Sequence, residues 1–343
     1  DKNEGLLAIY GMNDVNNAIG LWKEIPYHKE TKIYEGLKVY LRDAGHILGS
    51  SMIEFRAKEA KTLFTGDLGN SPTPLLKDTE KIEDIDYLIM ESVYGDRNHE
   101  PKDERRKKLA DVINQTAKRG GAVVIPAFSL ERTQVILYEL NHLVESDQIP
   151  SLPVFVDSPL AIKVTSIYKA SENYFNEKVR EEIKGGDDIF NFPRLKFSMT
   201  GQDSIAIRNI PNPKIIIAGS GMSSGGRITH HEINYLPDPR STILLVGYQS
   251  VGTIGRQLQD GAKKVKINGQ EVVVKAHIET ILGYSSHKDS DHLVEFVDST
   301  KETLKKVFVV MGEPKASLFL VQKLRDNLAV NAIYPEKGKV YEL

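Results

Sequence analysis

The middle of the chain alternates short apolar runs with segments that have the period of a helix, and this alternation constrains the fold most. A short apolar run predicts a strand, and apolar residues every three or four positions predict a helix. Strands are expected over residues 122–128, 153–157, 214–218 and 242–246, and helices over 130–144, 160–174 and 225–235. Strands separated by helices of this length indicate a parallel, doubly wound sheet that is covered on both faces.

Strand-like runs on both sides of this central region predict a second domain. They are expected over residues 38–42, 51–57, 61–65 and 87–91, and helix–strand pairs return over 290–310 and 316–334. Asn268-Gly269 predicts a tight hairpin between strands over 263–267 and 272–281. We therefore expect an outer domain, preceded by a helix over 14–25, whose two ends enclose an inserted α/β domain.

The composition narrows the classes of function. The chain has 343 residues, enough for two domains, and no cysteine, so any metal must be bound by His, Asp or Glu. Its net charge of -2 means that a nucleic acid would need a local basic groove. No apolar run approaches the roughly 18 residues that span a bilayer, and the N-terminus lacks the apolar core of a secretory signal. We expect a cytoplasmic protein with no membrane partner.

Two glycine-flanked stretches each place a metal-competent side chain just after a strand-like run. They are Asp43-Ala-Gly-His46-Ile-Leu-Gly-Ser50 and Phe64-Thr-Gly-Asp67-Leu-Gly69. A histidine and an aspartate on loops at strand ends can share one cation. Taken singly, each is more often a hydrogen-bonded loop residue, so the pair needs further partners to indicate a site.

Two later residues supply acid–base chemistry. Glu91 ends an apolar run, and His287 lies in Tyr284-Ser-Ser-His287-Lys-Asp289, after another predicted strand. A histidine near a glutamate can hold a proton near neutral pH and deliver it to a leaving group. The string from His287 to His292 is rich in metal-ligand types, but Asp291 and His292 fall at the start of an amphipathic helix, so we do not expect it to bind a metal.

A glycine- and serine-rich loop from Ala218 to Arg227 lies between a predicted strand and a predicted helix. Free backbone amides at a helix N-terminus can bind phosphate oxygens, and an arginine adds a charged fork. The alternative is a simple tight turn. The residues Phe128, Asp157 and Ser158 also end strands, so we expect them to line the same rim.

Together these stretches resemble the β-CASP branch of RNA-processing nucleases in the metallo-β-lactamase superfamily. The stretches around His46, Asp67 and Glu91 occur in the order of that family, followed by Ile125-Pro-Ala-Phe128, Asp157-Ser-Pro-Leu-Ala161, Ala218-Gly-Ser-Gly-Met222, Gly225-Gly-Arg227, Gly247-Tyr-Gln249 and Ser285-Ser-His-Lys-Asp289. The resemblance implies an α/β protein: a metallo-β-lactamase αββα sandwich over residues 1–97 and 283–343, incomplete at the N-terminus, with a doubly wound β-CASP domain inserted over 98–282.

The resemblance also implies roles for individual residues. His46 would bind the first zinc and Asp67 would bridge two zincs, with manganese as an alternative metal. Glu91 would orient His287, which would assist protonation of the leaving oxygen. RNA would lie in the cleft between the two domains, facing the residues Phe128, Arg132, Asp157, Ser158, Ser220, Gly221, Ser224, Gly225, Gly226 and Arg227.

Two departures from the family pattern bear on this expectation. The signature His-x-His-x-Asp-His, which supplies four ligands, occurs nowhere in the chain, so we expect a truncated form of a longer protein. The last ligand of the family is a histidine, but Met311 stands at that position, in Val310-Met311-Gly312-Glu313. A thioether suits copper(I) better than zinc. The implied second metal site therefore lacks this ligand, and we expect the chain alone to be inactive.

The first hypothesis is that the full-length protein is a zinc-dependent ribonuclease that acts in RNA processing or decay. A homodimer is one assembly that it could form. The alternative is a non-catalytic β-CASP protein that binds RNA or a nuclease partner. Met311, in place of a histidine ligand, suggests this alternative. A metallo-hydrolase of small molecules fits poorly, because such enzymes lack the large insertion between Glu91 and His287.

Overall fold

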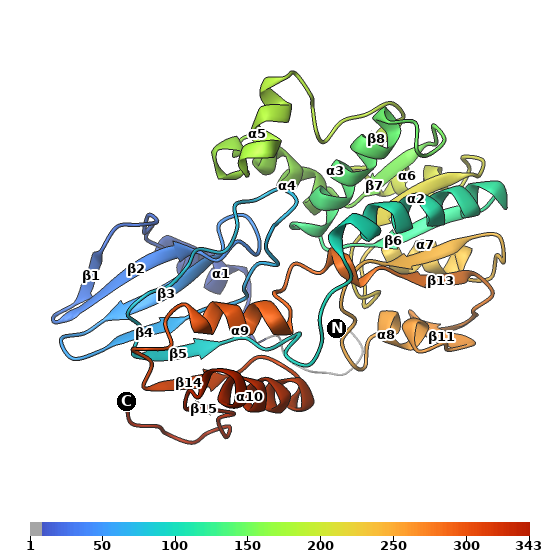
Figure 1. Ribbon diagram of the computed structural model, residues 1–343. Coiled ribbons are helices and arrows are strands. Elements are labelled where there is room, and N and C mark those ends of the chain that lie inside the picture. The colour runs from blue at the N-terminus through green and yellow to red at the C-terminus, as the bar shows by residue number, and fades with distance from the viewer. Residues whose placement is uncertain (1–8) are drawn as a thin grey trace.

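Two large β-sheets, each with its own helices, organise the protein, and a two-stranded hairpin forms a third, small sheet (Figure 1). The computed structural model describes residues 9–343. The outer domain supplies one sheet, and the inserted domain, residues 102–280, supplies the other. No helix in this described part is long and apolar enough to cross a membrane.

The outer sheet has seven strands in the order β1-β2-β3-β4-β5-β14-β15. They are β1 (Thr31–Tyr34), β2 (Leu37–Asp43), β3 (Ser51–Arg56), β4 (Lys61–Phe64), β5 (Tyr87–Met90), β14 (Lys306–Val309) and β15 (Ala332–Ile333). The pairs from β1 to β4 are antiparallel, and those from β4 to β15 are parallel. Parallel neighbours need crossovers, and the inserted domain lies within the one from β5 to β14.

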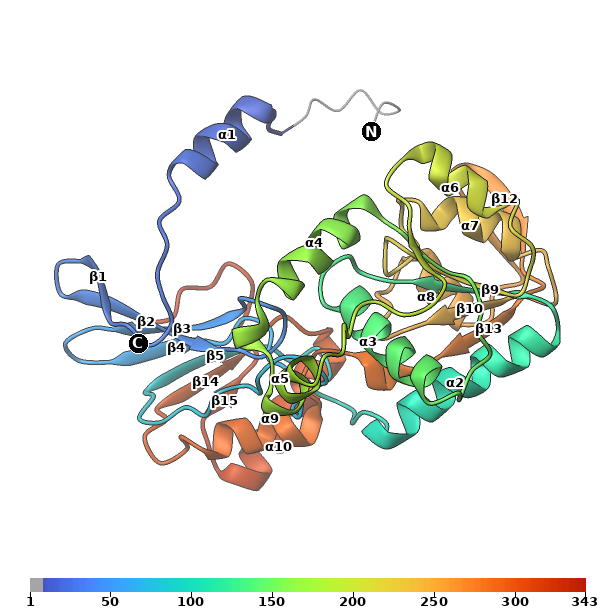
Figure 2. The same cartoon turned by 90° about the horizontal axis from the view of Figure 1, so that it is seen from above.

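One face of the outer sheet carries its core. Because side chains alternate along a strand, Met52, Leu63 and Leu88 point to the same face and pack against α9 (Ser290–Asp298) and α10 (Pro314–Leu328). On the other face, Ile53 pairs with Phe64, and these side chains are 37% and 42% exposed. The described residues therefore provide one sheet and one helical layer of the expected αββα sandwich. Helix α1 (Met12–Gly20) has no buried residue and lies apart from both sheets (Figure 2).

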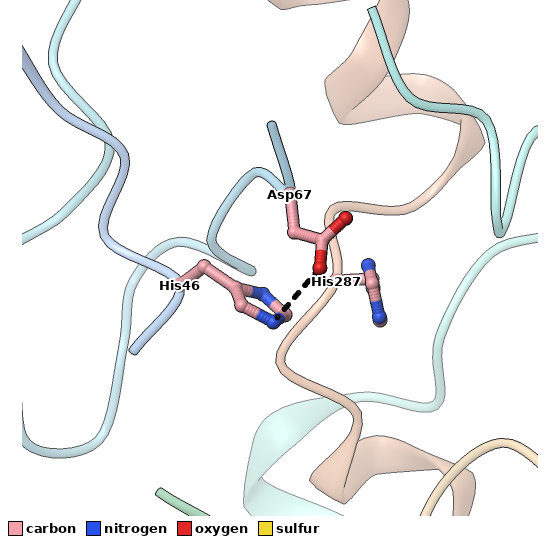
Figure 3. A group of neighbouring side chains, drawn as sticks. All are labelled: His46, Asp67 and His287. Carbon is pink, nitrogen blue, oxygen red and sulfur yellow. Dashed lines mark ion pairs between the residues drawn. The ribbon is translucent and has the colours of Figure 1, made fainter. Parts of the chain in front are cut away.

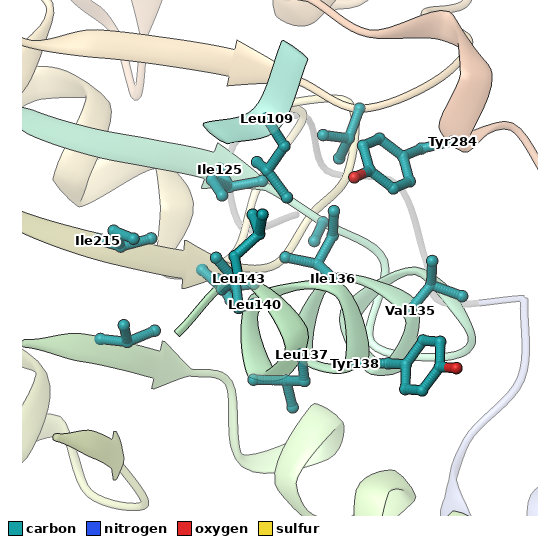
Figure 4. Close-up of a cluster of buried hydrophobic side chains, with 14 of the residues drawn as sticks. Leu109, Ile125, Val135, Ile136, Leu137, Tyr138, Leu140, Leu143, Ile215 and Tyr284 are labelled. Carbon is teal, nitrogen blue, oxygen red and sulfur yellow. The ribbon is translucent and has the colours of Figure 1, made fainter. Parts of the chain in front are cut away.

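The inserted domain is built on a six-stranded parallel sheet in the order β13-β10-β6-β9-β7-β8. Its strands are β6 (Ala122–Pro126), β7 (Val154–Asp157), β8 (Leu195–Phe197), β9 (Lys214–Ala218), β10 (Thr242–Leu245) and β13 (His277–Thr280). One apolar cluster joins the sheet to α2 (Lys102–Lys118), α3 (Arg132–Glu145), α4 (Pro159–Lys169) and α5 (Glu177–Lys184) (Figure 4). A second cluster on the other face includes α6 (Gly201–Ile207), α7 (Ile228–Tyr235) and α8 (Ile254–Gln259). The predicted doubly wound sheet is confirmed.

Some predicted elements differ in the structure. The expected strand over 272–281 is two strands, because β12 (Gln270–Val273) closes the Asn268-Gly269 hairpin with β11 (Lys264–Ile267), while β13 joins the large sheet. The expected helix over 160–174 ends at Lys169, and a separate 3-10 turn, Glu172–Tyr174, follows. Apolar periodicity continues across both breaks, so it does not mark them.

The two domains touch through the segment between β4 and β5. Leu75 and Leu76 of the outer domain belong to the apolar cluster of the inserted domain, and Leu76 forms a β-bridge with Phe175. The backbone N–H of Leu48 donates to the hydroxyl of Tyr168 on α4, at 3.2 Å. The loop that carries His46 is thereby fastened to the inserted domain.

Candidate active site

His46 lies on a tight loop after β2 that is held by its own polar residues. Asp43 accepts a hydrogen bond from the N–H of Gly45 at 2.8 Å, and the Ser50 hydroxyl accepts one from the N–H of His46 at 3.1 Å. Gly45 has a φ of +64°, and a Cβ there would lie 2.6 Å from the backbone nitrogen of Thr79. A larger residue would push this loop away from its neighbour, so glycine is required.

The imidazole of His46 is oriented by a backbone carbonyl from a distant segment. Its Nδ1 lies 3.2 Å from the carbonyl oxygen of Ser286, so Nδ1 carries the proton and Nε2 has a free lone pair. Burial, and then the charge of His287, lower the pKa of His46 to about 4. A neutral imidazole with an exposed lone pair is the form that binds metals.

Asp67 faces this free nitrogen. It follows β4 by way of Gly66, whose φ of +55° turns the chain, and its Oδ2 lies 3.7 Å from Nε2 of His46. Figure 3 shows the carboxylate between the rings of His46 and His287. One ligand atom from each of these three residues lies within 4.8 Å of the others.

Glu91 holds His287 in this arrangement. The Glu91 side chain is fully buried, both of its oxygens lie 3.1 Å from Nδ1 of His287, and it also accepts a hydrogen bond from the N–H of Leu68 at 2.6 Å. Burial lowers the pKa of His287, but the hydrogen bond and charge of Glu91 outweigh it, so the pKa is raised above 6.5. The structure brings together the four residues that the sequence singled out for metal and proton chemistry.

The donor set suits a divalent cation. Two imidazole nitrogens and a carboxylate are common zinc ligands, and water completes the coordination in open sites. Met311 is not part of this cluster: it follows β14, is 63% exposed and has a φ of +60°. The neighbouring Gly312 packs against Ser92, and Glu313 accepts a hydrogen bond from the Tyr248 hydroxyl of the inserted domain. This segment therefore connects the two domains.

Arg132 reaches the cluster from the inserted domain. It is the first residue of α3, its side chain is 7% exposed, and its Nη2 donates to the hydroxyl of Ser286 at 3.2 Å. Its Nε has no hydrogen-bond partner, and its ion pairs include no carboxylate among the side chains that the structure describes, 9–101 and 104–343, although the charge of the neighbouring buried Glu131 raises its pKa. Burial lowers the pKa of Arg132 to about 10, so it stays positive at neutral pH. Burial of a cation is costly, and a bound anion at the unpaired Nε would reduce that cost.

The glycine-rich loop forms a rim whose members have different roles. A Cβ on Gly221 would lie 2.7 Å from the ring of Phe128, and on Gly226 it would lie 2.5 Å from the carbonyl oxygen of Gly219. Ser224 is exposed, and the ring of Phe128 is 46% exposed. The N–H of Ser224 donates to the hydroxyl of Ser220 at 3.0 Å, which closes the turn.

Three residues predicted to face RNA, Asp157, Ser158 and Arg227, make contacts within the protein, and the full burial of Asp157 corrects the expectation for that residue. Asp157 is fully buried and accepts hydrogen bonds from Arg227 and His231, both at 2.7 Å. Arg227 also donates to the carbonyl oxygens of Ser198 at 2.9 Å and Met199 at 3.0 Å. The guanidinium therefore clamps the loop to β7 and β8. Ser158 is likewise inward-facing, because its hydroxyl caps α4.

Sequence patterns gave no sign of several of these contacts. The carbonyl of Ser286, which orients His46, is a backbone group that any residue could supply. Tyr168 bonds both the His46 loop and the buried Glu131, yet it lies in an ordinary amphipathic helix. Such contacts depend on the packing of the two domains and have no fixed spacing in the chain.

Comparison with known proteins gives two family matches and several relatives. A Beta-Casp domain model matches residues 133–258, and a model described as a Zn-dependent metallo-hydrolase RNA specificity domain matches residues 271–335. A ribonuclease of Thermus thermophilus is 32% identical, over 91% of this chain and 70% of its own length. An RNase J-like protein of Methanocaldococcus jannaschii is 31% identical, over 98% of this chain and 78% of its own length. The transcription termination factor FttA of Pyrococcus abyssi is 32% identical, over 97% of this chain and 53% of its own length.

Proposed function

The chain belongs to the β-CASP family of RNA nucleases in the metallo-β-lactamase superfamily, and from this we propose that it hydrolyses phosphodiester bonds of RNA with a bound divalent cation. One observation carries the proposal. His46, Asp67 and His287 converge from three distant segments of the outer domain, and the buried guanidinium of Arg132, whose Nε has no hydrogen-bond partner, approaches them from the inserted domain. A metal-competent cluster beside a buried cation is suited to a phosphate group.

The residues of the site have different roles in the proposed reaction. His46 and Asp67 would hold the cation, which would lower the pKa of a water and stabilise charge on phosphorus. His287 keeps a proton at Nε2 because Glu91 raises its pKa, and it gives that proton to the leaving ribose oxygen. Glu91 stays bonded to Nδ1 throughout and fixes the direction of Nε2.

Substrate recognition falls to the inserted domain. Arg132 offers an unpaired N–H to a phosphate oxygen next to the cluster, and the exposed ring of Phe128 offers a surface on which a base can stack. The loop at Ser224 and Gly226 allows close approach of the RNA backbone. Asp157 and Arg227 keep this loop in shape without touching RNA. Zinc is the metal we propose, with manganese as the second choice.

Cleavage of an end-labelled RNA tests the proposal. The protein is expressed from its complete reading frame, stripped of metal and reloaded with Zn²⁺ or Mn²⁺. We expect cleavage that a chelator stops and that Asp67→Ala abolishes, while His230→Ala, on the exposed face of α7, keeps wild-type activity. His287→Ala should slow cleavage by about 10²–10⁴-fold, the usual range for a general acid. No cleavage with either metal, or full cleavage by His287→Ala, would contradict the proposal.

Met311 favours a second candidate function. Its exposed thioether stands where the family has a histidine ligand and is not a zinc ligand. A protein that binds RNA without cutting it would be consistent with that substitution. The same assay separates the two functions, because the second predicts RNA retention at saturating metal with no products. The 343-residue chain by itself offers few ligands, so we expect it to cleave poorly.

A further inference from the structure

Glu232 is a buried carboxyl group beneath the glycine-rich loop, and it takes no part in the site described above. It lies on α7 and shares a face of that helix with Ile228 and Tyr235, because residues three or four positions apart on a helix point the same way. Both neighbours belong to the apolar cluster on this face of the sheet, and the side chain of Glu232 is fully buried. An ionisable group in such surroundings needs a physical explanation.

In the described part of the chain, no cation forms an ion pair with Glu232. The strands against which α7 packs, β6 and β10, carry no ionisable side chain. The buried Tyr235 on α7 stays neutral, because burial raises its pKa to about 12, and His230 is exposed to solvent. The remaining cations of the loop, α7, α8 and β9 have other partners: Arg227 and His231 pair with Asp157, Arg256 pairs with Asp260, and Lys214 donates to the carbonyl oxygens of Ile207 and Ile210.

The hydrogen bonds of Glu232 suit a neutral carboxyl group. Its Oε1 bonds the hydroxyl of Ser223 in the loop, and its buried Oε2 has no partner among the residues described. A carboxylate that is buried with one donor and no cation is costly, and the group avoids this cost by keeping its proton. Burial, opposed by the bond from Ser223, raises the pKa of Glu232 to about 8. The structure therefore favours the protonated form at pH 7.

The bond between Glu232 and Ser223 anchors an unusual part of the loop. Ser223 is fully buried and has a φ of +59°, in the left-handed region that few residues other than glycine adopt. Its N–H donates to the carbonyl oxygen of Ser220 at 3.2 Å, and the next residue, Ser224, is exposed at the rim. A side chain that is anchored at Ser223 therefore fixes the direction of the exposed turn.

We propose that protonated Glu232 is a positioning residue for RNA binding: it holds Ser223, keeps the turn at Ser224 and Gly226 in the shape that contacts RNA, and releases this turn when it ionises. The inference rests on the proposed function, because it takes the loop as a contact for RNA. The ionised carboxylate needs water around both oxygens, and the loop that covers it must move to admit that water. The proton itself passes to the solvent, so RNA binding weakens as the pH rises.

RNA binding by the wild type and by Glu232→Gln at two pH values tests the proposal. Glutamine has the shape of the protonated carboxyl group and cannot ionise. Metal-free protein from the complete reading frame binds labelled RNA in a filter assay, and the ratio of the two affinities cancels every group that both proteins share. We expect equal affinities at pH 6.5. With a pKa of about 8, about one Glu232 in eleven keeps its proton at pH 9, so the wild type should bind about 10-fold more weakly than Glu232→Gln there.

Two further variants show whether the loop transmits the effect. Ser223→Ala removes the bond to Glu232 and should bind RNA weakly at both pH values. Glu271→Gln is the matched control, since this glutamate is exposed on the small hairpin and pairs with Lys264, and it should follow the wild-type pH profile. Equal pH profiles of the wild type and Glu232→Gln, or wild-type affinity of Ser223→Ala at pH 6.5, overturn the inference.

Infrared difference spectra separate a failure of this inference from a failure of the proposed function, because they need no RNA. At pH 7 the wild type should show the C=O stretch of one protonated carboxyl group that Glu232→Gln lacks, and this band should disappear from the wild type at pH values well above 8. Absence of the band at pH 7 overturns the inference. A protein that shows the band and its loss, but binds RNA at neither pH, counts against the proposed function alone.

Discussion

Replacing Glu91 by glutamine should lower the pKa of His287 and weaken the fold of the outer domain in a pH-dependent way. Glu91 is fully buried and bonds Nδ1 of His287 and the N–H of Leu68. Glutamine has nearly the same shape but no charge, and its NH₂ group would face at least one donor. A hydrogen bond to a charged group contributes about 1.5–3 kcal/mol, so we expect a loss of that size. For a domain of about 150–250 residues this lowers the midpoint of thermal unfolding by about 3–12 °C.

The sign of the pH dependence follows from the raised pKa of His287. A group whose pKa is higher in the folded than in the unfolded protein stabilises the fold fully below its unfolded pKa, near 6.5, and loses that contribution as pH rises through the folded value. Glu91→Gln should therefore destabilise the metal-free protein more at pH 5.5 than at pH 9. Part of the loss remains at high pH, because the bond from Leu68 does not depend on His287.

Thermal unfolding of the metal-free protein at these two pH values is the assay, and Glu54→Gln is the matched control. Glu54 is equally buried in the same sheet, but its partners Arg42 and Arg56 stay charged throughout this range. Glu54→Gln should therefore lower the stability of the fold by the same amount at both pH values. Proton NMR titration of His287 should also show a lower pKa in Glu91→Gln. An equal loss of stability for Glu91→Gln at both pH values, with an unchanged pKa of His287, would refute the reasoning.

Three further predictions concern other parts of the site. Asp157→Asn leaves Arg227 without its buried counter-ion and should cost about 3–5 kcal/mol in urea unfolding at pH 7. The hydrogen bonds to Asp157 outweigh burial and lower its pKa below 3.8, so the difference should shrink only as the pH falls below that value, and a difference that shrinks already at pH 5 would contradict this. Arg132→Met should weaken RNA binding by about 10-fold or more at fixed salt in a filter assay, with Arg132→Lys retaining part of it, whereas equal binding by all three proteins would remove Arg132 from the RNA contact. Gly226→Ala forces a Cβ to within 2.5 Å of the Gly219 carbonyl oxygen and should reduce RNA binding, while Gly201→Ala, where a Cβ meets nothing within 4 Å, should not; equal effects would mean that the loop does not contact RNA.

Much of the fold followed from local patterns, because its strands and helices bury faces that are visible in the chain. Runs such as 122–128 and 214–218 are apolar throughout, as a strand covered on both faces must be, and the doubly wound sheet came out as predicted. The hairpin at Asn268-Gly269 was also predicted, because Asn and Gly readily adopt the positive φ that such a turn needs. Both residues have a positive φ in the structure. Strands β1 and β8 were missed, because both lie at sheet edges and carry few buried residues.

The sequence predicted the ionisable residues of the candidate site, but not the groups that hold and orient them. Loops after strands placed His46, Asp67, Glu91 and His287 correctly as neighbours, because glycines and strand ends mark such positions in the sequence. The pairing of Asp157 with Arg227 was not predicted, because it joins β7 to a loop 70 residues away, and no local pattern shows that. Arg132 lies at the start of a helix like many others, and only the packed structure shows that it is buried beside the cluster with an Nε that has no hydrogen-bond partner.

The most direct test of the central claim is cleavage of a labelled RNA by protein from the complete reading frame, with and without added metal. After removal of metal we expect no products, and after addition of Zn²⁺ or Mn²⁺ we expect products from the wild type but not from Asp67→Ala. A metal-free protein that still cleaves, or an Asp67→Ala variant that cleaves at the wild-type rate, would contradict a metal-dependent nuclease centred on His46, Asp67 and His287.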